Sequence, residues 1–236
     1  MNDPIRISAK NLGALALPGS CPRCNWLKLH LGHKLPYQIF PGIFSSIDGF
    51  TKRVVHTWFD EHGAPPAWLD PLGTIVGYRE PPHFSKFNML NEDHGVLLTG
   101  AADGILVRDD GSFVIVDYKT AKFSGAQDEL LPMYEVQLNA YAAIGEHCGF
   151  APVTGLALIY MEPMSDGQTC FEGQCCEYGF DMGFSAHVIN VQLNADMLSP
   201  LLARVRAEHD RPAPPRRHPG CKDCNLTDWL VELFVG

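Results

Sequence analysis

Two aspartates and a lysine lie within one predicted β-hairpin, in the stretch GAADGILVRDDGSFVIVDYKT at residues 100–120. If residues 109–111 form the hairpin loop, Asp103 lies opposite Asp117 on the neighbouring strand. A loop one residue longer or shorter would make the two aspartates diagonal neighbours instead. Strand alternation puts Lys119 on the same face as Asp117, about 6.8 Å along the strand. Two carboxylates and an ammonium group therefore converge at the end of an otherwise apolar strand.

This set of groups fits the hydrolysis of a phosphodiester with the help of a metal ion. Two carboxylates close together in a site of low dielectric constant repel each other unless a cation lies between them. Mg²⁺ binds one or two carboxylates, keeps several waters and completes its coordination with substrate phosphate. Lys119 would orient or help to deprotonate the attacking water, or stabilise charge that develops on the phosphate. The alternative is that Asp117 and Lys119 are surface residues at a strand end, because a lone D-x-K pattern is common by chance.

The elements that must position these residues follow from the spacing of apolar residues along the chain. Helical spacing predicts helices over 46–62, 130–147 and 195–209, and a short helix over 21–35. Apolar and β-branched segments bounded by turn residues predict strands at 96–98, 104–108, 112–119 and 155–161, with further β segments near 177–183 and 186–193. Residues 1–20 are expected to form an irregular lead-in, and the Pro-rich segment 64–82 a connector.

Three segments together resemble the PD-(D/E)XK nuclease superfamily, in particular its RecB-like branch, to which the nucleases of CRISPR adaptation also belong. The segments are GAAD at 100–103, VDYKT at 116–120 and QLNAY at 137–141, which match the G-x-x-D, D-x-K and Q-x-x-x-Y signatures of that branch. The combination is much more specific than any one part, and it covers residues 96–145 closely. The resemblance implies a restriction-endonuclease-like core, in which helices flank a mixed central β-sheet.

The resemblance also implies a metal site in the hairpin. Mg²⁺ or Mn²⁺ would be held by the side chains of Asp103 and Asp117 and by the backbone carbonyl of Tyr118. Lys119 would be the catalytic lysine of this site.

Further roles are implied outside the hairpin. Gln137 and Tyr141, four residues apart on one helical face, would position the DNA strand or the active-site loop. Many members of the family take an additional His or Glu ligand from an early helix, and His56 is the candidate here. Glu61 or Glu80 could serve in its place.

Two C-x₂-C pairs form a second candidate site, with Cys21 and Cys24 near one end of the sequence and Cys221 and Cys224 near the other. Two such pairs supply the four thiolates of a structural Zn²⁺ or of an iron–sulfur cluster. The resemblance favours a 4Fe-4S cluster, because RecB-like nucleases often carry one with ligands from both ends. Their usual pattern is one early and three late cysteines, however, whereas this chain has two and two. Zinc and the cluster are therefore both open at this point.

The order of the predicted elements indicates an α/β fold in a single nuclease-like domain. The domain is expected to span 1–236, with its core at about 46–210 and a cysteine module formed by 18–35 and 218–236. A metal shared by the two cysteine pairs would join the ends of the sequence.

Composition limits the class of protein and its partners. The chain of 236 residues is 46% hydrophobic and 19% charged, which is enough to build a core. Its apolar runs are too short to span a bilayer, so a soluble, cytoplasmic protein without membrane partners is expected. The net charge of −9 argues against general affinity for nucleic acid, so phosphate binding must be local or carried by metal ions. No phosphate-binding loop of the ATPase type occurs, so any helicase would be a separate polypeptide.

The resulting hypothesis is a Mg²⁺- or Mn²⁺-dependent deoxyribonuclease, an exonuclease on single-stranded DNA ends that acts in DNA repair, recombination or CRISPR adaptation. The phosphodiester chemistry follows from the site, whereas the choice of DNA over RNA and of ends over interior bonds follows from the resemblance alone. The alternative is a non-catalytic nucleic-acid-binding or scaffold subunit that keeps the fold and a structural metal. The presence of Asp103, Asp117 and Lys119 together counts against that alternative.

Overall fold

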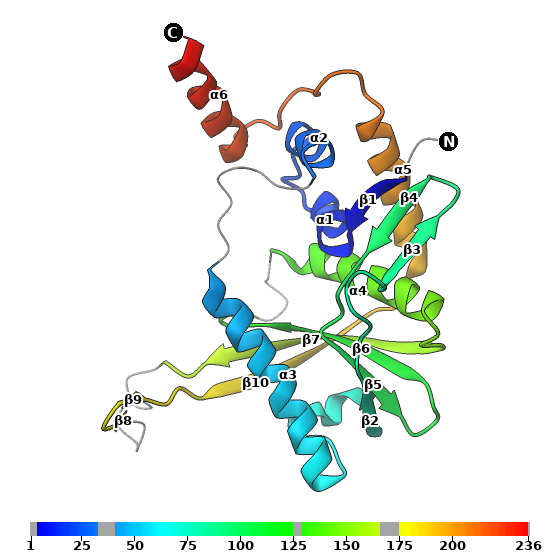
Figure 1. The fold of residues 1–236 in the computed structure, drawn as a ribbon, viewed down its shortest axis with the longest axis vertical. Helices are drawn as coiled ribbons and strands as arrows, with labels where there is room; N and C mark the ends of the chain where they lie inside the picture. The colour runs from blue at the N-terminus through cyan, green and yellow to red at the C-terminus, as the bar shows by residue number, and fades with distance from the viewer. Residues whose placement is uncertain (1–3, 33–40, 125–128, 166–174, 236) are drawn as a thin grey trace.

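A computed structural model describes residues 4–32, 41–124, 129–165 and 175–235 of the chain (Figure 1). The strands of this part are β1 (Ile5–Ser8), β2 (Ile75–Arg79), β3 (Asn88–Asn91), β4 (Val96–Thr99), β5 (Gly104–Arg108), β6 (Phe113–Lys119), β7 (Val153–Pro163), β8 (Cys175–Cys176), β9 (Gly179–Phe180) and β10 (Phe184–Val191). The helices are α1 (Ala9–Gly13), α2 (Pro22–His30), α3 (Gly42–His62), α4 (Leu131–His147), α5 (Leu198–His209) and α6 (Lys222–Val235), with 3₁₀ turns η1 (Ala14–Ala16), η2 (Ala67–Leu72) and η5 (Ala195–Met197). No described helix combines the length and the apolar character that crossing a membrane requires.

The central sheet has five strands in the order β10-β7-β6-β5-β2, and it is mixed, because β6 and β7 are parallel and the other neighbours are antiparallel. Both faces of the sheet are covered (Figure 1). On one face, Val114 and Val116 of β6 pack against α3 and η2. On the other face, Ile115 packs against α4. This confirms the predicted fold class, a mixed sheet flanked by helices, and explains why β6 is apolar on both faces.

A smaller sheet in the order β1-β4-β3 packs on the far side of α4, together with α1 and α5. Here α1 lies unusually close to α4: a Cβ atom added at Gly13 would lie 2.3 Å from the carbonyl oxygen of Met133. Only a residue without a side chain allows this approach. The contact fixes the first turn of α4, which is the helix that carries Gln137 and Tyr141.

The two segments that carry the cysteine pairs meet at one pole of the molecule, away from the central sheet. Helices α2 and α6 lie there side by side, and they carry the two C-x₂-C pairs (Figure 1). The predicted meeting of the two cysteine pairs is therefore confirmed.

Two of the expected irregular segments are ordered elements, so those predictions were wrong. Residues 1–20 contain β1, which pairs in parallel with β4, and α1, whose first turn is capped by the Ser8 hydroxyl accepting from the Asn11 N–H at 3.2 Å. The segment 64–82 contains η2 and β2, the edge strand beside β5. Strands β1 and β2 are short and depend on pairing with distant strands, which local sequence patterns do not reveal.

We expect Gly13→Ala to lower the free energy of unfolding by about 1–3 kcal/mol, because the added methyl group must displace the backbone of α4. Urea unfolding of the purified protein measures this change. Gly19→Ala is the control, since a Cβ atom there meets nothing within 4 Å. It should change stability by no more than about 0.5 kcal/mol. Equal stability of the two variants would show that the contact between α1 and α4 is not tight.

Candidate active site

The hairpin of β5 and β6 has the predicted register. Gly104 pairs with Val116, and Val107 pairs with Phe113, so Asp103 and Asp117 lie at its open end. The loop is at the opposite end of the hairpin. There Gly111 adopts a positive φ of 82°, which favours glycine.

Asp117 is the buried centre of the site, with 2% of its surface exposed. The side-chain amide of Gln137 donates to Asp117 Oδ1 at 3.0 Å and to the hydroxyl oxygen of Tyr141 at 2.9 Å. On the other oxygen, Oδ2, Asp117 forms an ion pair with the ammonium group of Lys119. Lys119 also lies over the ring of Tyr134, 4.5 Å from its centroid. The structure thus brings together the four predicted residues Asp117, Lys119, Gln137 and Tyr141.

Asp103 completes the pair of carboxylates. Its Oδ2 accepts from the backbone N–H of Tyr118 at 2.9 Å, which ties it to the strand that carries Asp117. Burial raises the pKa of Asp103, and the charge of Asp117 raises it further, while the ammonium group of Lys52 acts in the opposite direction. The two carboxylates therefore repel each other, as the sequence predicts, and cations compensate them.

The rings of Tyr118 and Tyr141 are buried in different hydrophobic clusters. The ring of Tyr118 is buried in the cluster under α3, and its backbone N–H donates to Asp103. The ring of Tyr141 packs against Gly100, where a Cβ atom would lie 2.7 Å from the ring. This contact explains the glycine that begins the segment GAAD. Burial raises the pKa of Tyr141, as does the charge of Asp117, so its hydroxyl stays protonated near neutral pH.

Two further residues of the site, Asp48 and Lys52 on α3, were missed in the sequence. Lys52 Nζ lies 2.8 Å from Asp103 Oδ1 and 2.9 Å from Asp48 Oδ2. Burial raises the pKa of Asp48, and so does the charge of Asp103, while Lys52 opposes both effects. The sequence did contain a signal for these two residues. Asp48 and Lys52 have opposite charges four residues apart, next to the buried face of α3 that includes Thr51 and Val55.

The candidates for an additional metal ligand, His56, Glu61 and Glu80, lie away from Asp103 and Asp117. His56 Nδ1 is 3.0 Å from Glu80 Oε1, and the His56 ring stacks on Tyr78 with centroids 3.9 Å apart. These contacts are at the edge strand β2. Glu61 is exposed in the last turn of α3. None of the three candidates lines the cleft that contains Asp103 and Asp117.

A cleft of about 540 Å³ opens over the two carboxylates. Its walls come from α1, the N-terminal half of α3, the end of β6 and α4, and they include Lys10, Asp48, Lys119 and Tyr134. Carboxylate oxygens are the ligands that Mg²⁺ and Mn²⁺ prefer, and Asp103 and Asp117 both line this cleft. The residues at this end of the hairpin thus fit a divalent metal ion.

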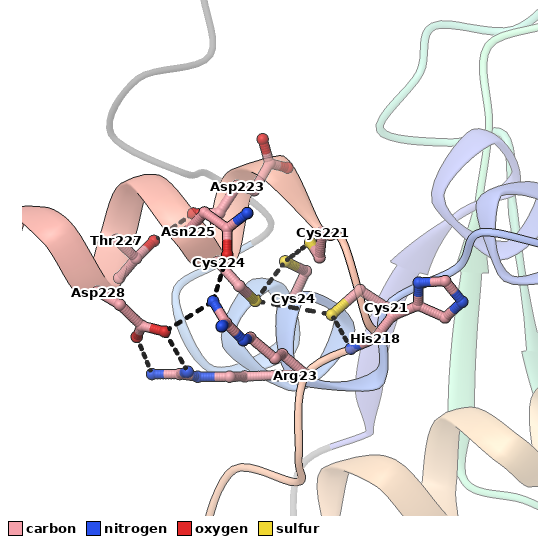
Figure 2. Close-up of polar contacts among 11 residues, drawn as sticks. Cys21, Arg23, Cys24, His218, Cys221, Asp223, Cys224, Asn225, Thr227 and Asp228 are labelled. Carbon is pink, nitrogen blue, oxygen red and sulfur yellow. Dashed lines mark hydrogen bonds and ion pairs between the residues drawn. The ribbon is translucent and has the colours of Figure 1, made fainter.

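The second candidate site is formed by the four cysteines (Figure 2). Figure 2 shows their sulfur atoms facing one another, and all four lie within 4.8 Å of one another. The closest pairs are Cys24 and Cys224 at 3.4 Å, Cys24 and Cys221 at 3.5 Å, and Cys21 and Cys224 at 3.6 Å. Among the described residues, this is the one group of three or more Cys, His, Asp or Glu side chains close enough to hold a metal ion.

The local structure lowers the pKa of one thiol at this site, that of Cys21, whereas burial raises the pKa of Cys24 and of Cys224. Each C-x₂-C pair is at a helix N-terminus, where backbone N–H groups and the helix dipole stabilise negative charge. Burial alone would raise the pKa of Cys21, but N–H groups, above all that of His218 at 3.2 Å, lower it to about 7. Beside the sulfurs, both ends of the Arg23 guanidinium contact Asp228 of α6, at 2.9 and 3.3 Å (Figure 2). This ion pair joins α2 to α6 independently of a metal.

The sequence of the chain matches a known protein family over most of its length. One solved structure, described as the crystal structure of SSO0001, matches 91% of this chain and 81% of its own, with 14% identity and a TM-score of 0.43. No curated protein matches the chain. A family model described as the PD-(D/E)XK nuclease superfamily matches residues 42–229, which include α3, the hairpin, α4 and the second cysteine pair. The chain belongs to the PD-(D/E)XK nuclease superfamily.

Proposed function

We propose that this protein is a Mg²⁺- or Mn²⁺-dependent deoxyribonuclease of the RecB-like branch, which degrades DNA from single-stranded ends. Membership of the superfamily fits a metal-dependent nuclease. The observation that carries the proposal is the buried Asp117 carboxylate, which contacts Lys119 and Gln137 and lies beside Asp103. A buried carboxylate needs compensating partners, and two carboxylates beside a lysine are groups that can hold a metal ion and act on a phosphodiester.

Each residue of the site has a role in this proposal. Asp103 and Asp117 would hold the metal ion, with the carbonyl of Tyr118 as a third ligand. When bound, the ion would stabilise charge on the phosphate and activate a water molecule. Lys119 would then orient that water or contact the phosphate, held in place by the ring of Tyr134.

The amide of Gln137 keeps Asp117 in a single orientation and is itself fixed by the hydroxyl of Tyr141. This link between a Q-x-x-x-Y helix and the D-x-K strand supports the RecB-like branch. Lys10 and Lys119 lie at the cleft, where their ammonium groups would contact a phosphate backbone once a metal ion compensates the aspartates. The choice of DNA, of single-stranded ends and of a separate helicase, recombination or adaptation partner rests on the likeness to that branch.

We further propose that the four cysteines hold one tetrahedral metal ion, of which Zn²⁺ is the best fit. Zn–S bonds of about 2.3 Å put the sulfurs of a tetrahedron about 3.8 Å apart. The closest sulfur pairs here are 3.4–3.6 Å apart. A 4Fe-4S cluster binds each thiolate to a different iron at the outside of a cube, which spreads the sulfurs more widely. The short distances therefore support zinc over the cluster. The bound ion would make residues 1–236 one folding unit.

Substitutions in the hairpin test the nuclease activity. Lys119→Ala and Asp117→Asn should each lower the rate of DNA cleavage at least about 100-fold, because each removes a group that acts at the reacting phosphate. The assay incubates end-labelled single-stranded and duplex DNA with Mg²⁺ or Mn²⁺, and EDTA should abolish cleavage. Lys122→Ala is the matched control, since this lysine is exposed and lines a different cavity. Its rate should equal that of the unmodified protein.

The same assay separates the alternatives. Equal rates for Lys119→Ala and the unmodified protein would contradict the proposed site, and no cleavage of any nucleic acid would favour a scaffold subunit. Circular single-stranded DNA should stay intact while linear DNA is degraded, because an exonuclease requires an end. Cleavage of the circle would show an endonuclease.

Metal analysis tests the cysteine site. Anaerobically purified protein should contain about one zinc per chain and no visible absorbance band, and Cys221→Ser should lose this metal and unfold at a lower temperature. Cys175→Ser is the control, since Cys175 is exposed and outside the group. Iron with visible absorbance would show a cluster instead, and full metal content in Cys221→Ser would refute a shared site.

A further inference from the structure

Lys52 occupies an unusual position for a lysine on an early helix. Its ammonium group lies between two carboxylates, 2.8 Å from Asp103 Oδ1 and 2.9 Å from Asp48 Oδ2. The side chain is 29% exposed. A lysine whose role was only to stabilise α3 would pair with Asp48 at the surface, and such pairs contribute little to the free energy of unfolding. Lys52 instead reaches the hairpin, where it contacts a carboxylate that is proposed to bind metal.

The charges around Lys52 set how many metal ions the site can hold. Asp48, Asp103 and Asp117 bring three negative charges, and Lys52 and Lys119 bring two positive ones. One divalent ion and one phosphodiester together add one positive charge, which offsets the single negative charge of these five groups, and Lys10 at the cleft adds a further positive charge. A second divalent ion would add two positive charges next to two ammonium groups in a partly buried site, which repulsion opposes.

Lys52 also contacts the two carboxylates that a second metal ion would use as ligands. Two-metal sites hold their ions about 3.5–4 Å apart, with carboxylates shared between them. Beyond the pair Asp103 and Asp117, Asp48 is the cleft carboxylate that could help to hold a second ion. The ammonium group of Lys52 lies between Asp48 and Asp103, within ion-pair distance of both.

We propose that Lys52 acts as a built-in cation in place of a second metal ion, so that the site binds one divalent ion. This inference rests on the proposed function, because it takes Asp103 and Asp117 as metal ligands. Lys52 is a positioning residue in this account, since it acts through Asp103 and Asp48. Its ammonium group supplies permanently the charge that a second ion would bring, and it keeps Asp103 turned towards the Tyr118 N–H.

The test is the number of Mn²⁺ ions bound per chain, measured by electron paramagnetic resonance of the free ion during titration. The full chain is used with its cysteine metal in place. The unmodified protein should bind one Mn²⁺, and Lys52→Met should bind two, because the neutral side chain frees Asp48 and Asp103 for a second ion. Lys52→Met combined with Asp48→Asn should bind one again, since the second ion then lacks a ligand.

Two control variants separate charge at this place from charge in general. Lys52→Arg keeps a cation between the aspartates and should bind one Mn²⁺. Arg53→Met removes a positive charge from the next position of α3, where the side chain is exposed and lies over Phe50, and it should also bind one. A second ion in Arg53→Met would overturn the inference, because the effect would then come from general electrostatics.

The outcomes distinguish this inference from the function on which it rests. One ion in Lys52→Met, with the fold intact by circular dichroism, would overturn the role of Lys52 and leave the proposed nuclease site standing. Two ions bound to the unmodified protein would also overturn the role of Lys52 and leave the proposed nuclease site standing. No bound ion in the unmodified protein would overturn both. If Lys52→Met does not fold, Lys52→Gln replaces it, because glutamine is neutral and can still donate to one aspartate.

Discussion

The structure of the site depends on one buried carboxylate, that of Asp117, with 2% of its surface exposed. An ionised carboxylate in such a place is costly unless hydrogen bonds and opposite charges compensate it. Here the amide of Gln137 donates to one oxygen, and the ammonium group of Lys119 forms an ion pair with the other. These two partners come from different elements, α4 and β6. The burial of one carboxylate therefore constrains how the central helix sits on the central sheet.

The rest of the fold holds these elements in register. The turn at the far end of the hairpin sets β5 against β6, so that Asp103 lies beside Asp117. Gly13 lets α1 approach the backbone of α4, and Gly100 admits the ring of Tyr141. Helix α3 covers the other face of the sheet and brings Lys52 to Asp103. These close contacts limit the conformations that the carboxylates can adopt. Groups held in place in this way can stabilise the charge that develops in a transition state without first reorganising.

Local features of the sequence predicted the parts of this site that depend on local geometry. The loop of the hairpin fixes its register, and strand alternation fixes Lys119 relative to Asp117, so both could be predicted. Lys52 could not, because its contact depends on how α3 lies across the sheet. His56 is one helical turn further along α3 than Lys52, and its side chain contacts Glu80 and Tyr78 instead of the carboxylates at the hairpin. Strand β2 was missed because Val76 is exposed at a sheet edge and buried and exposed residues do not alternate along the strand.

The cysteine pairs were also predictable, since C-x₂-C at a helix start presents both thiolates on one side. Their meeting joins α2 to α6 away from the central sheet, while the carboxylates form a separate centre at the cleft. The central claim is that the carboxylates, not the cysteines, hold the ion that hydrolyses DNA. Anomalous diffraction from a crystal soaked in Mn²⁺ tests it most directly. The account predicts a manganese peak between Asp103 and Asp117, and a crystal with no peak at these carboxylates would contradict it.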